Sequence, residues 1–500
     1  MKSTDCRQIF HPLFFVGSLL WLLLFIQFET PSFAQNQITP SAKPFLHALF
    51  TNHMVLQRDI TAPIWGWTTP GEKVTVRLTG PGVLETTSTT TAGADGKWMT
   101  KLGPLKAGGP YSLVVSGPQQ VTLQDVLVGD VWLCSGQSNM KMGMSMVATP
   151  GDIAAADHPK LRLFSVPYAL AFSPSKNITS QWDLCTPQSL VAATDQWGGF
   201  SAVAYYFGKY LLEKYQVPIG LIHSSWGGSV VEAWVSGNSL KKTPEYAPAI
   251  RDLEAQAGSL PAENQNAPTV LFNGMIAPLV PFGIKGAIWY QGESNIGRHA
   301  EYAKILPLLI EDWRAHWNLG AFPFLIVQLP NMGPPAEQPG ESQWASLREV
   351  QAQVASNLPN VGLAVTIDLG QADNIHPPRK EEVGVRLSLV ARNLVYGEKV
   401  EASGPVYSGM KSEHNALRIS FYHANGLAAK DGGKLTGFAI AGQDMRWVWA
   451  DATIDGSDVL LSSPSVSKPT VAGYNWADNP NGNLTNATGL PAAPFRTDAR

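Results

Sequence analysis

The sequence predicts an α/β fold, in which a parallel sheet is sandwiched by helices and flanked by an N-terminal and a C-terminal β region. Between residues 125 and 398, apolar runs alternate with amphipathic segments. This pattern is typical of a parallel sheet whose strands are buried on both faces. Residues 42–122 and 400–500 instead carry short alternating segments and turn signals, which favour antiparallel strands.

The central region divides into strands and helices that follow one another along the chain. The expected strands are Leu127–Cys134, Leu161–Val166, Ile219–Ser224, Lys285–Tyr290, Phe324–Leu329 and Gly362–Asp368. The expected helices are Ser201–Tyr215, Tyr302–Trp317 with an interruption at Pro307, Trp344–Ala355 and Lys380–Val395. Because parallel sheets bind ligands at the carboxyl ends of their strands, the residues that follow each strand are the candidates for a site.

The two flanking regions are predicted from local alternation. In the N-terminal one, we expect strands at Lys73–Leu78 and Tyr111–Val115, with turns at Pro70-Gly71 and Pro81-Gly82. In the C-terminal one, we expect strands at Leu417–Tyr422, Arg446–Ile454 and Asp458–Ser463. A chain of 500 residues accommodates two or three such domains.

Composition narrows the class of partner. Apolar residues make up 44% of the chain and charged residues 15%, which is a globular composition with ample material for a core. The formal net charge of −3 gives no electrostatic reason to expect nucleic acid or an anionic membrane as a partner.

Residues 1–34 have the pattern of a secretory signal peptide. Lys2 and Arg7 precede the apolar run Leu13–Ile26, and Ser32-Phe33-Ala34 gives a small-x-small cleavage site. The alternative is a membrane anchor, but a run of 14 residues is shorter than the roughly 20 that span a bilayer. We therefore expect an exported protein, periplasmic or extracellular, with no membrane span after cleavage.

Two cysteines, Cys134 and Cys185, remain in the mature chain. They either pair in an oxidising compartment or stay as two buried thiols, and the sequence leaves both alternatives open.

Four strand ends carry polar clusters. These clusters are Gly136-Gln137-Ser138-Asn139, Ser225-Trp226-Gly227-Gly228-Ser229, Gln291-Gly292-Glu293-Ser294-Asn295 and Asp373-Asn374-Ile375-His376-Pro377. A sheet brings such ends to one edge even when they lie far apart along the chain.

Together the clusters contain the parts of a serine esterase. Such an enzyme needs a nucleophile, a base and an acid that orients the base, for which we predict Ser138, His376 and Asp373. Asp368 is the rival orienting acid because it ends its expected strand directly. His158, in a similar Asp-His-Pro context, is expected to be structural because it does not follow a strand.

An esterase also needs N–H donors for the oxyanion of its tetrahedral intermediate. Gly227 or Gly228 can present a backbone N–H, since glycine allows close approach. Gln291 or Asn295 can add a side-chain amide, and Gln291 is preferred because it lies nearest the strand end.

At this point the chain resembles the sialate O-acetylesterase family, within the SGNH/GDSL-type hydrolases. The similar stretches are "FTNHMVLQRD", "GDVWLCSGQSNM", "SSWGGSVVEAW", "LFNGMIAPLVPFGIKGAIWYQGESN", "IDLGQADNIHPPRKEEVGVRLSL" and "YNWADNPNGNLTNATGLPAAPFRTD". They are spread over most of residues 45–498, and the set is highly specific.

The resemblance implies an SGNH-hydrolase-like sheet and a triad of Ser138, His376 and Asp373. It also implies that the Ser138 N–H joins the oxyanion hole and that Glu293 holds its loop or binds substrate. Lys141 departs from the family pattern, in which an acidic residue is expected after Gln-Ser-Asn-Met.

The rest of the sequence narrows the chemistry. No Gly-x-Ser-x-Gly surrounds the serine, which argues against an α/β-hydrolase elbow. The sequence contains no His-Glu-x-x-His or comparable ligand set, so we predict neither a metal nor a cofactor.

The leading hypothesis is an exported carbohydrate O-acetylesterase. The family name favours 9-O-acetylated sialic acid as substrate, and an acetylated plant polysaccharide such as xylan is the alternative. A sialate carboxylate requires an arginine in the site, for which Arg298 and Arg379 are the candidates. The alternative of another class is a non-catalytic glycan-binding protein that uses Trp447, Trp449 and Trp476, although core packing is the favoured role of these tryptophans.

Overall fold

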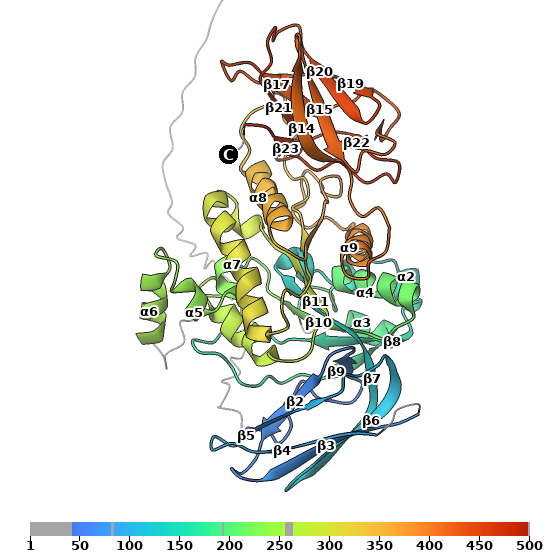
Figure 1. Cartoon of the computed structure of the whole chain (residues 1–500), viewed down its shortest axis with the longest axis vertical. Helices are drawn as coiled ribbons and strands as arrows, with labels where there is room; N and C mark the ends of the chain where they lie inside the picture. Colours follow the sequence, from blue (N-terminus) through green and yellow to red (C-terminus); the bar gives the residue numbers. More distant parts are fainter. Residues whose placement is uncertain (1–42, 82–84, 193–194, 256–263, 499–500) are drawn as a thin grey trace, which may run out of the picture. The chain divides into compact units, whose positions relative to one another are not determined.

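A mostly parallel sheet is the centre of the fold (Figure 1). The computed structural model describes residues 43–81, 85–192, 195–255 and 264–498. The central strands, in their order across the sheet, are β13 (Val361–Ala364), β12 (Phe324–Val327), β11 (Gly286–Tyr290), β7 (Gln120–Gly136), β10 (Ile219–Ser225), β8 (His158–Ser165) and β9 (Trp182–Cys185). Neighbours from β13 to β8 are parallel, and β9 is antiparallel to β8. This confirms the predicted α/β fold.

Helices cover both faces of the sheet. On one face, α4 (Ala202–Tyr215) and α9 (Lys380–Leu394) share a hydrophobic cluster with the strands. On the other, α7 (His299–Trp317) and α8 (Gln343–Asn357) do the same, as Figure 1 shows. The shorter helices are α1 (Ser138–Lys141), α2 (Pro150–Ala154), α3 (Pro187–Val191), α5 (Gly237–Leu240) and α6 (Ala247–Ala255).

Two expected boundaries in this core are wrong. Pro307 does not interrupt α7, because the buried Leu306, Leu309 and Ile310 hold the helix against the sheet. Their burial outweighs the roughly 3 kcal/mol that an interior proline costs. The last strand ends at Ala364 rather than at Asp368, since the Thr366 hydroxyl donates to the Gln328 carbonyl at 2.5 Å and the chain leaves the ladder.

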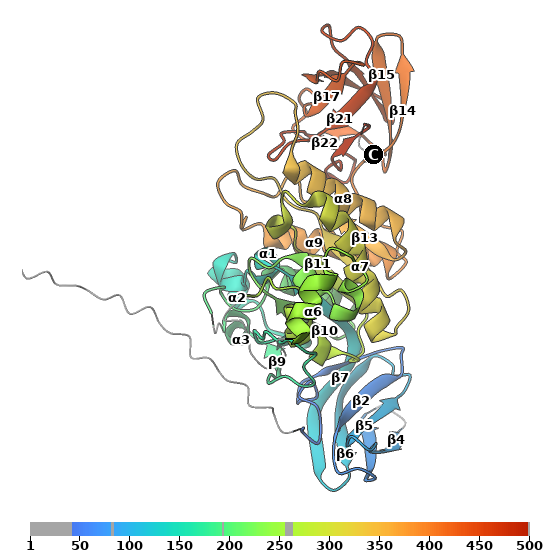
Figure 2. The ribbon, with the colours of Figure 1, turned by 90° about the vertical axis from the view of Figure 1, so that its left-hand side faces the viewer.

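The N-terminal β region shares a strand with the core. Its strands are β1 (Val55–Gln57), β2 (Ala62–Trp67), β3 (Lys73–Thr79), β4 (Thr86–Thr91), β5 (Lys97–Leu102) and β6 (Gly108–Ser116). Figure 2 shows β7 beside this region, where it pairs with β1 and β6, and its last residues pair with β10 and β11. The domain boundary predicted at residues 122–125 therefore falls inside one continuous strand.

The C-terminal β region contains short antiparallel pairs around a core of its own. Its strands are β14 (Val406–Glu413), β15 (Ala416–Tyr422), β16 (Ala428–Ala429), β17 (Phe438–Ala441), β18 (Val448–Trp449), β19 (Asp451–Asp455), β20 (Asp458–Ser462), β21 (Val471–Tyr474), β22 (Leu484–Thr485) and β23 (Phe495–Arg496).

Cys134 and Cys185 are free, buried thiols, so they do not form the disulfide that the sequence left open. Burial raises the pKa of the Cys185 thiol to about 12. Among the residues described, no helix has the length and apolar character needed to cross a membrane. The predicted signal peptide, residues 1–34, lies outside the described residues.

Candidate active site

Ser138 stands at the carboxyl end of the central strand. β7 ends at Gly136, whose φ is +141°, and Ser138 begins α1 two residues later. A Cβ at Gly136 would lie 2.1 Å from the Tyr290 carbonyl oxygen, so the turn leaves room for glycine alone. The Gln137 N–H donates to that same carbonyl at 3.0 Å and fixes the position of the serine.

Gly227 lies directly beside the serine. It follows β10, and a Cβ built on it would be 3.5 Å from the Ser138 Cβ. Within the described chain, the backbone N–H groups of Ser138 and Gly227 have no hydrogen-bond acceptor. Gly228 differs, because a Cβ built on it would meet only Gln265, at 4.0 Å and away from the serine, and its φ is +72°. Of the two predicted glycines, Gly227 is therefore the one placed to donate to an oxyanion.

His376 reaches the same place through an aromatic contact. Its half-buried ring packs edge-on against Trp197 with the centroids 5.4 Å apart, and a Cβ on Gly227 would lie 2.8 Å from the same indole. Among the described residues, no hydrogen bond joins the imidazole to the Ser138 hydroxyl. Such a bond is often loose before substrate binds, so this geometry is compatible with a serine–histidine pair.

Asp373 lies in the same loop as His376, and its side chain is exposed. The loop is closed by Asn374, which accepts the His376 N–H at 2.9 Å and donates to Gln371 at 3.0 Å. No hydrogen bond or ion pair joins Asp373 to His376 in the part of the chain that the structure describes. Its role as the orienting acid stays a prediction.

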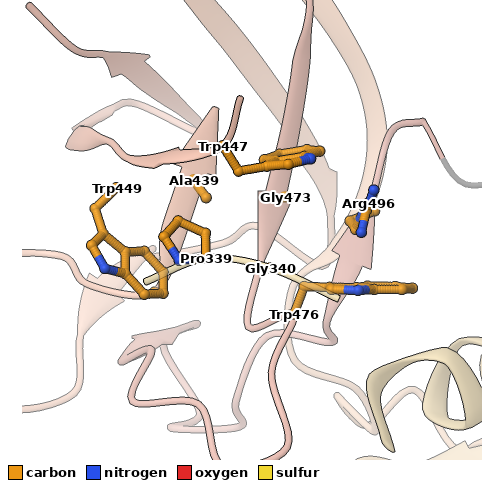
Figure 3. A pocket seen from close by; sticks show the side chains of 9 residues that line it. Pro339, Gly340, Ala439, Trp447, Trp449, Gly473, Trp476 and Arg496 are labelled. Carbon is orange, nitrogen blue, oxygen red and sulfur yellow. The ribbon is translucent and has the colours of Figure 1, made fainter. Parts of the chain in front are cut away.

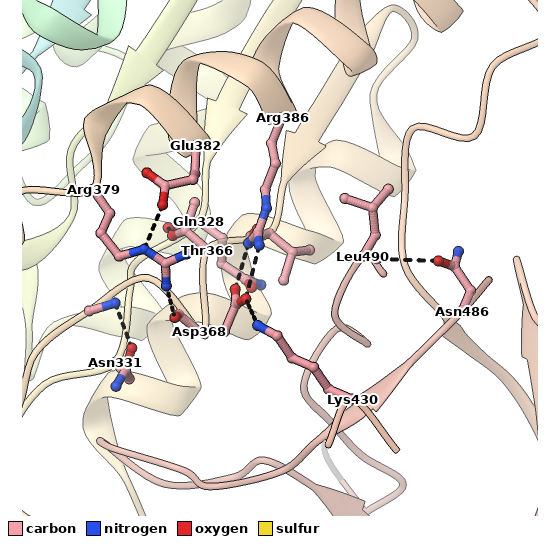
Figure 4. A network of polar contacts seen from close by, with 12 residues as sticks. Gln328, Asn331, Thr366, Asp368, Arg379, Glu382, Arg386, Lys430, Asn486 and Leu490 are labelled. Carbon is pink, nitrogen blue, oxygen red and sulfur yellow. Dashed lines mark hydrogen bonds and ion pairs between the residues drawn. The ribbon is translucent and has the colours of Figure 1, made fainter. Parts of the chain in front are cut away.

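The rival acid, Asp368, is fully engaged with cations (Figure 4). Arg386 binds both of its carboxylate oxygens, at 2.6 and 2.9 Å, and Lys430 binds one at 3.0 Å. These cations lower the pKa of the Asp368 carboxyl to about 2 despite its burial. Asp368 therefore pairs with Arg386 and Lys430 rather than with an imidazole.

The two predicted amides are buried and tie two loops together. The Gln291 amide donates to the Ser229 carbonyl at 3.2 Å and to the Asn295 Oδ1 at 2.6 Å. Asn295 also accepts the Val231 N–H at 3.0 Å and donates to Glu232 at 3.1 Å. Both hydrogens of the Gln291 amide thus have protein acceptors, whereas among the described residues the Asn295 amide has an acceptor for only one of its two.

A second Ser–His pair lies nearby and is built differently. Ser225 and His223, two residues apart on β10, share a 2.6 Å hydrogen bond. Both side chains are buried, and burial keeps the pKa of His223 well below its ordinary value. Because it is closed off from solvent, we regard this pair as structural.

Sequence reasoning missed the group that joins the nucleophile to the histidine, which is the amide of Asn139. Its Nδ2 donates to the Ile375 carbonyl at 2.9 Å and to the Glu293 Oε1 at 2.5 Å. Its Oδ1 accepts from the buried Lys380 ammonium at 2.5 Å. The residue after Ser138 is therefore bonded to the residue before His376. The available signal was adjacency, since Asn139 belongs to the cluster of the serine and Lys380 lies three residues beyond the cluster of the histidine.

This network also assigns Glu293. Burial raises the pKa of its carboxyl and lowers that of the Lys380 ammonium to about 7. Glu293 therefore holds Asn139, which is the loop-holding one of its two implied roles.

Three cations near the motifs, Arg298, Arg379 and Lys141, have carboxylate partners. Arg298 binds Glu232 at 2.7 Å and Glu301 at 3.1 Å. The other two pairs are Arg379–Glu382 at 2.7 Å and Lys141–Asp195 at 3.0 Å.

The departure at Lys141 has a local explanation. Asp195, its partner, also accepts the Trp197 backbone N–H at 2.9 Å. The pair therefore fixes the backbone of the tryptophan whose indole packs against His376. The Lys141 ammonium also lies 5.0 Å from the Tyr168 ring, which packs on Trp226 beside Gly227.

Comparison with known proteins identifies this arrangement. The sequence model of a carbohydrate esterase family, the sialic acid-specific acetylesterases, matches residues 128–391. The sialate O-acetylesterase of Pongo abelii is 33% identical over 464 residues, which cover 86% of this chain and 87% of that protein. That of Mus musculus is 32% identical over 476 residues, covering 85% and 88%. The crystal structure of a carbohydrate acetylesterase from Xanthomonas citri superposes with a TM-score of 0.80 at 38% identity, covering 91% of this chain and all of that one.

Replacing Asn139 tests the link between the two motifs. Asn139→Ala should lower kcat for p-nitrophenyl acetate about 100-fold with little change in KM, because the histidine is displaced from the serine. The kcat of Asn139→Asp should lie between those of the parent and Asn139→Ala, since the aspartate still accepts from Lys380. Asn273→Ala is the matched control, because this buried amide donates to the Ala171 carbonyl outside the site. A parent-like kcat in Asn139→Ala would rule out the positioning role.

The acid limb of the pH profile tests the environment of His376. Burial and the charge of Lys380 lower the pKa of His376, so the imidazole stays neutral to a lower pH than its ordinary value of about 6.5. Activity should therefore be lost only below that value. Lys380→Met removes the charge and should shift the acid limb of kcat/KM to higher pH. The exposed Lys106, replaced in the same way, should leave the limb in place; a shift to lower pH in Lys380→Met would contradict the assignment.

Proposed function

Since the chain belongs to the carbohydrate esterase family of sialic acid-specific acetylesterases, we propose that it is an exported serine esterase that removes O-acetyl groups from sugars through an acyl-enzyme. That it is a carboxylic ester hydrolase follows from its family. The observation that carries the serine mechanism is the meeting of three groups at one sheet edge: the Ser138 side chain, the Gly227 backbone and the Trp197–His376 contact.

In the proposed mechanism, His376 takes the proton of the Ser138 hydroxyl as the oxygen attacks the acetyl carbonyl. The N–H groups of Ser138 and Gly227 receive the oxyanion. The intermediate then collapses, and His376 returns the proton to the departing sugar hydroxyl. A water molecule, with His376 again as base, hydrolyses the acetyl-enzyme and releases acetate. Asp373 is the proposed orienting acid, because Asp368 is held by Arg386 and Lys430.

O-acetylated sialic acid is the first candidate substrate. The support is the family description and the activity named for the curated relatives, with which this chain shares about a third of its residues over most of its length. The oxyanion hole and nucleophile act on the ester itself, so the sugar is chosen by contacts around them.

A neutral acetylated polysaccharide such as xylan is the second candidate, and one observation favours it. A sialate carboxylate binds best to an unpaired cation. In the described structure, Lys141, Arg298 and Arg379 each already face a carboxylate. A neutral sugar requires no such partner.

The nucleophile and the substrate are tested together. Acetate release is measured from a 9-O-acetylated sialoside and from acetylated xylan, with p-nitrophenyl acetate as the small ester. Ser138→Ala should lower kcat by several orders of magnitude on every ester that the parent cleaves. Ser225→Ala is the control for the buried Ser–His pair. If this variant lost the activity and Ser138→Ala kept it, the nucleophile would be misassigned.

The same assay separates the two candidate substrates. Release from the sialoside alone supports the first candidate, and release from xylan alone supports the second. Hydrolysis of p-nitrophenyl acetate without release from either sugar would exclude both and leave the esterase mechanism in place.

Export is the remaining part of the proposal, supported by the Leu13–Ile26 run and the Ser32-Phe33-Ala34 site. The mass of the protein recovered after secretion should match a chain that begins at Gln35. A protein that keeps Met1, Lys2 and the apolar run would contradict the proposed cleavage.

A further inference from the structure

The C-terminal β region contacts the segment that carries the proposed base. We name residues Asp368–His376 the histidine loop. Its first half, Asp368–Ala372, is bonded to residues from 430 onward, which lie outside the stretch matched by the family model. The contacts are made by Lys430 directly and by Asn479 through an intermediate segment.

The Asn479 side chain is linked to the loop through the side chain of Asn331. Its Oδ1 accepts from the Asn331 amide at 2.7 Å, and its Nδ2 donates to the Gly333 carbonyl at 2.5 Å. The Asn331 Oδ1 in turn accepts the Gly370 N–H at 2.7 Å, a bond drawn in Figure 4. One side chain of the C-terminal region thus fixes the amide that holds the histidine loop.

The backbones on either side of this link are in direct contact. A Cβ at Gly370 would lie 1.9 Å from the Asn331 carbonyl oxygen, and the Gly333 N–H donates to the Ala372 carbonyl at 2.9 Å. No space separates residues 331–333 from the loop, so a displacement of one displaces the other. Ala372 immediately precedes Asp373.

Lys430 holds the start of the loop from the C-terminal region. Its ammonium binds the Asp368 carboxylate, which Arg386 of α9 binds from the other side (Figure 4). Arg379, three residues after His376, donates to the Asp368 carbonyl at 3.1 Å. The loop is thereby closed at its base by cations from two parts of the chain.

A buried arginine anchors the tail that carries Asn479. Arg348 of α8 is fully buried and donates to four carbonyls, those of Leu329, Pro330, Ala477 and Asp478, at 2.7–2.8 Å. Burial lowers the pKa of its guanidinium to about 9. The segment before Asn331 and the segment before Asn479 are therefore held by one side chain.

The tryptophans of the C-terminal β region lie against residues 339–340, as Figure 3 shows. The Arg496 guanidinium lies 4.8 Å from the Trp447 ring and 5.1 Å from the Trp476 ring, and it binds Glu341 at 2.7 Å. Trp449 donates to the Glu337 carbonyl at 3.0 Å. These contacts fix residues 337–341. The predicted core packing is wrong for these tryptophans, because Trp447, Trp449 and Trp476 line a pocket at the edge of this region and Trp449 is exposed.

We propose that the C-terminal β region positions the histidine loop for catalysis, with Asn479 and Lys430 as its positioning residues. The inference rests on the proposed function, in which His376 is the base. The C-terminal β region then affects ester hydrolysis by positioning the histidine loop, without itself contacting the substrate.

The test is Asn479→Ala in the full-length protein, assayed with p-nitrophenyl acetate. We expect kcat to fall about tenfold with KM nearly unchanged, because the base is less well placed. The acid limb of kcat/KM should shift to higher pH, since a looser loop exposes His376 and its pKa returns toward the ordinary value. Asn479→Asp keeps the acceptor for Asn331 and loses the donor to Gly333, so it should give a smaller change in both readouts.

Asn486→Ala is the matched control. Asn486 lies in the same tail and is buried, and its amide donates to the Ser403 carbonyl at 2.9 Å and to the His423 carbonyl at 3.3 Å rather than to the histidine loop or the segment that carries Lys430. It should leave both kcat and the acid limb in place. If Asn479→Ala does not fold, Lys430→Met is tested instead, because Lys430 is half-exposed. Its kcat should also fall and its acid limb should also shift to higher pH.

Two outcomes overturn the inference: a folded Asn479→Ala with the kcat and acid limb of the parent, or a shift of equal size in Asn486→Ala. Failure of the proposed function has a different signature, namely a parent that cleaves no ester or a Ser138→Ala that still does.

Discussion

The Asn139 amide is the interaction on which the geometry of the site depends. It lies between a buried ammonium and a buried carboxylate, those of Lys380 and Glu293. The Lys380 nitrogen donates to the amide oxygen and the Glu293 oxygen accepts from the amide nitrogen, so these partners fix which way the amide faces. Its second donor position then falls on the carbonyl before His376. Leaving either of these polar groups without a partner in the interior would be costly, which holds the three groups together.

The sheet supplies the other half of that geometry. Parallel order brings the ends of β7, β10 and β11 side by side, and two glycines make close approach there feasible. Gly136 lets the chain turn against the Tyr290 carbonyl, and Gly227 brings a backbone N–H to the serine. Aromatic contacts then complete the site, since Trp197 touches both Gly227 and His376 and is held by the Lys141–Asp195 pair.

The histidine loop has supports on two sides. The nucleophile helix holds it through Asn139, and the C-terminal β region holds it through Lys430 and the Asn479–Asn331 link. An exposed loop is ordinarily the most mobile part of a fold, whereas a general base must stay within a few tenths of an ångström of its partner. Supports from separate parts of the chain resolve that conflict, and they give a reason for the C-terminal region to remain attached to the core.

The sequence by itself determined the fold class, most strands and helices of the core, and the four motifs, because apolar periodicity and turn residues are local signals. Ser138, the Gly227-Gly228 pair and His376 were identified as candidates from such signals. Other features were decided by tertiary contacts: the continuity of α7 through Pro307, the engagement of Asp368 with Arg386 and Lys430, and the choice of Gly227 over Gly228. Asn139, Lys380 and Asn479 were missed for the same reason. An asparagine or lysine has no local mark of its partner, and the partners here lie more than a hundred residues away, so only the folded chain reveals what each side chain holds.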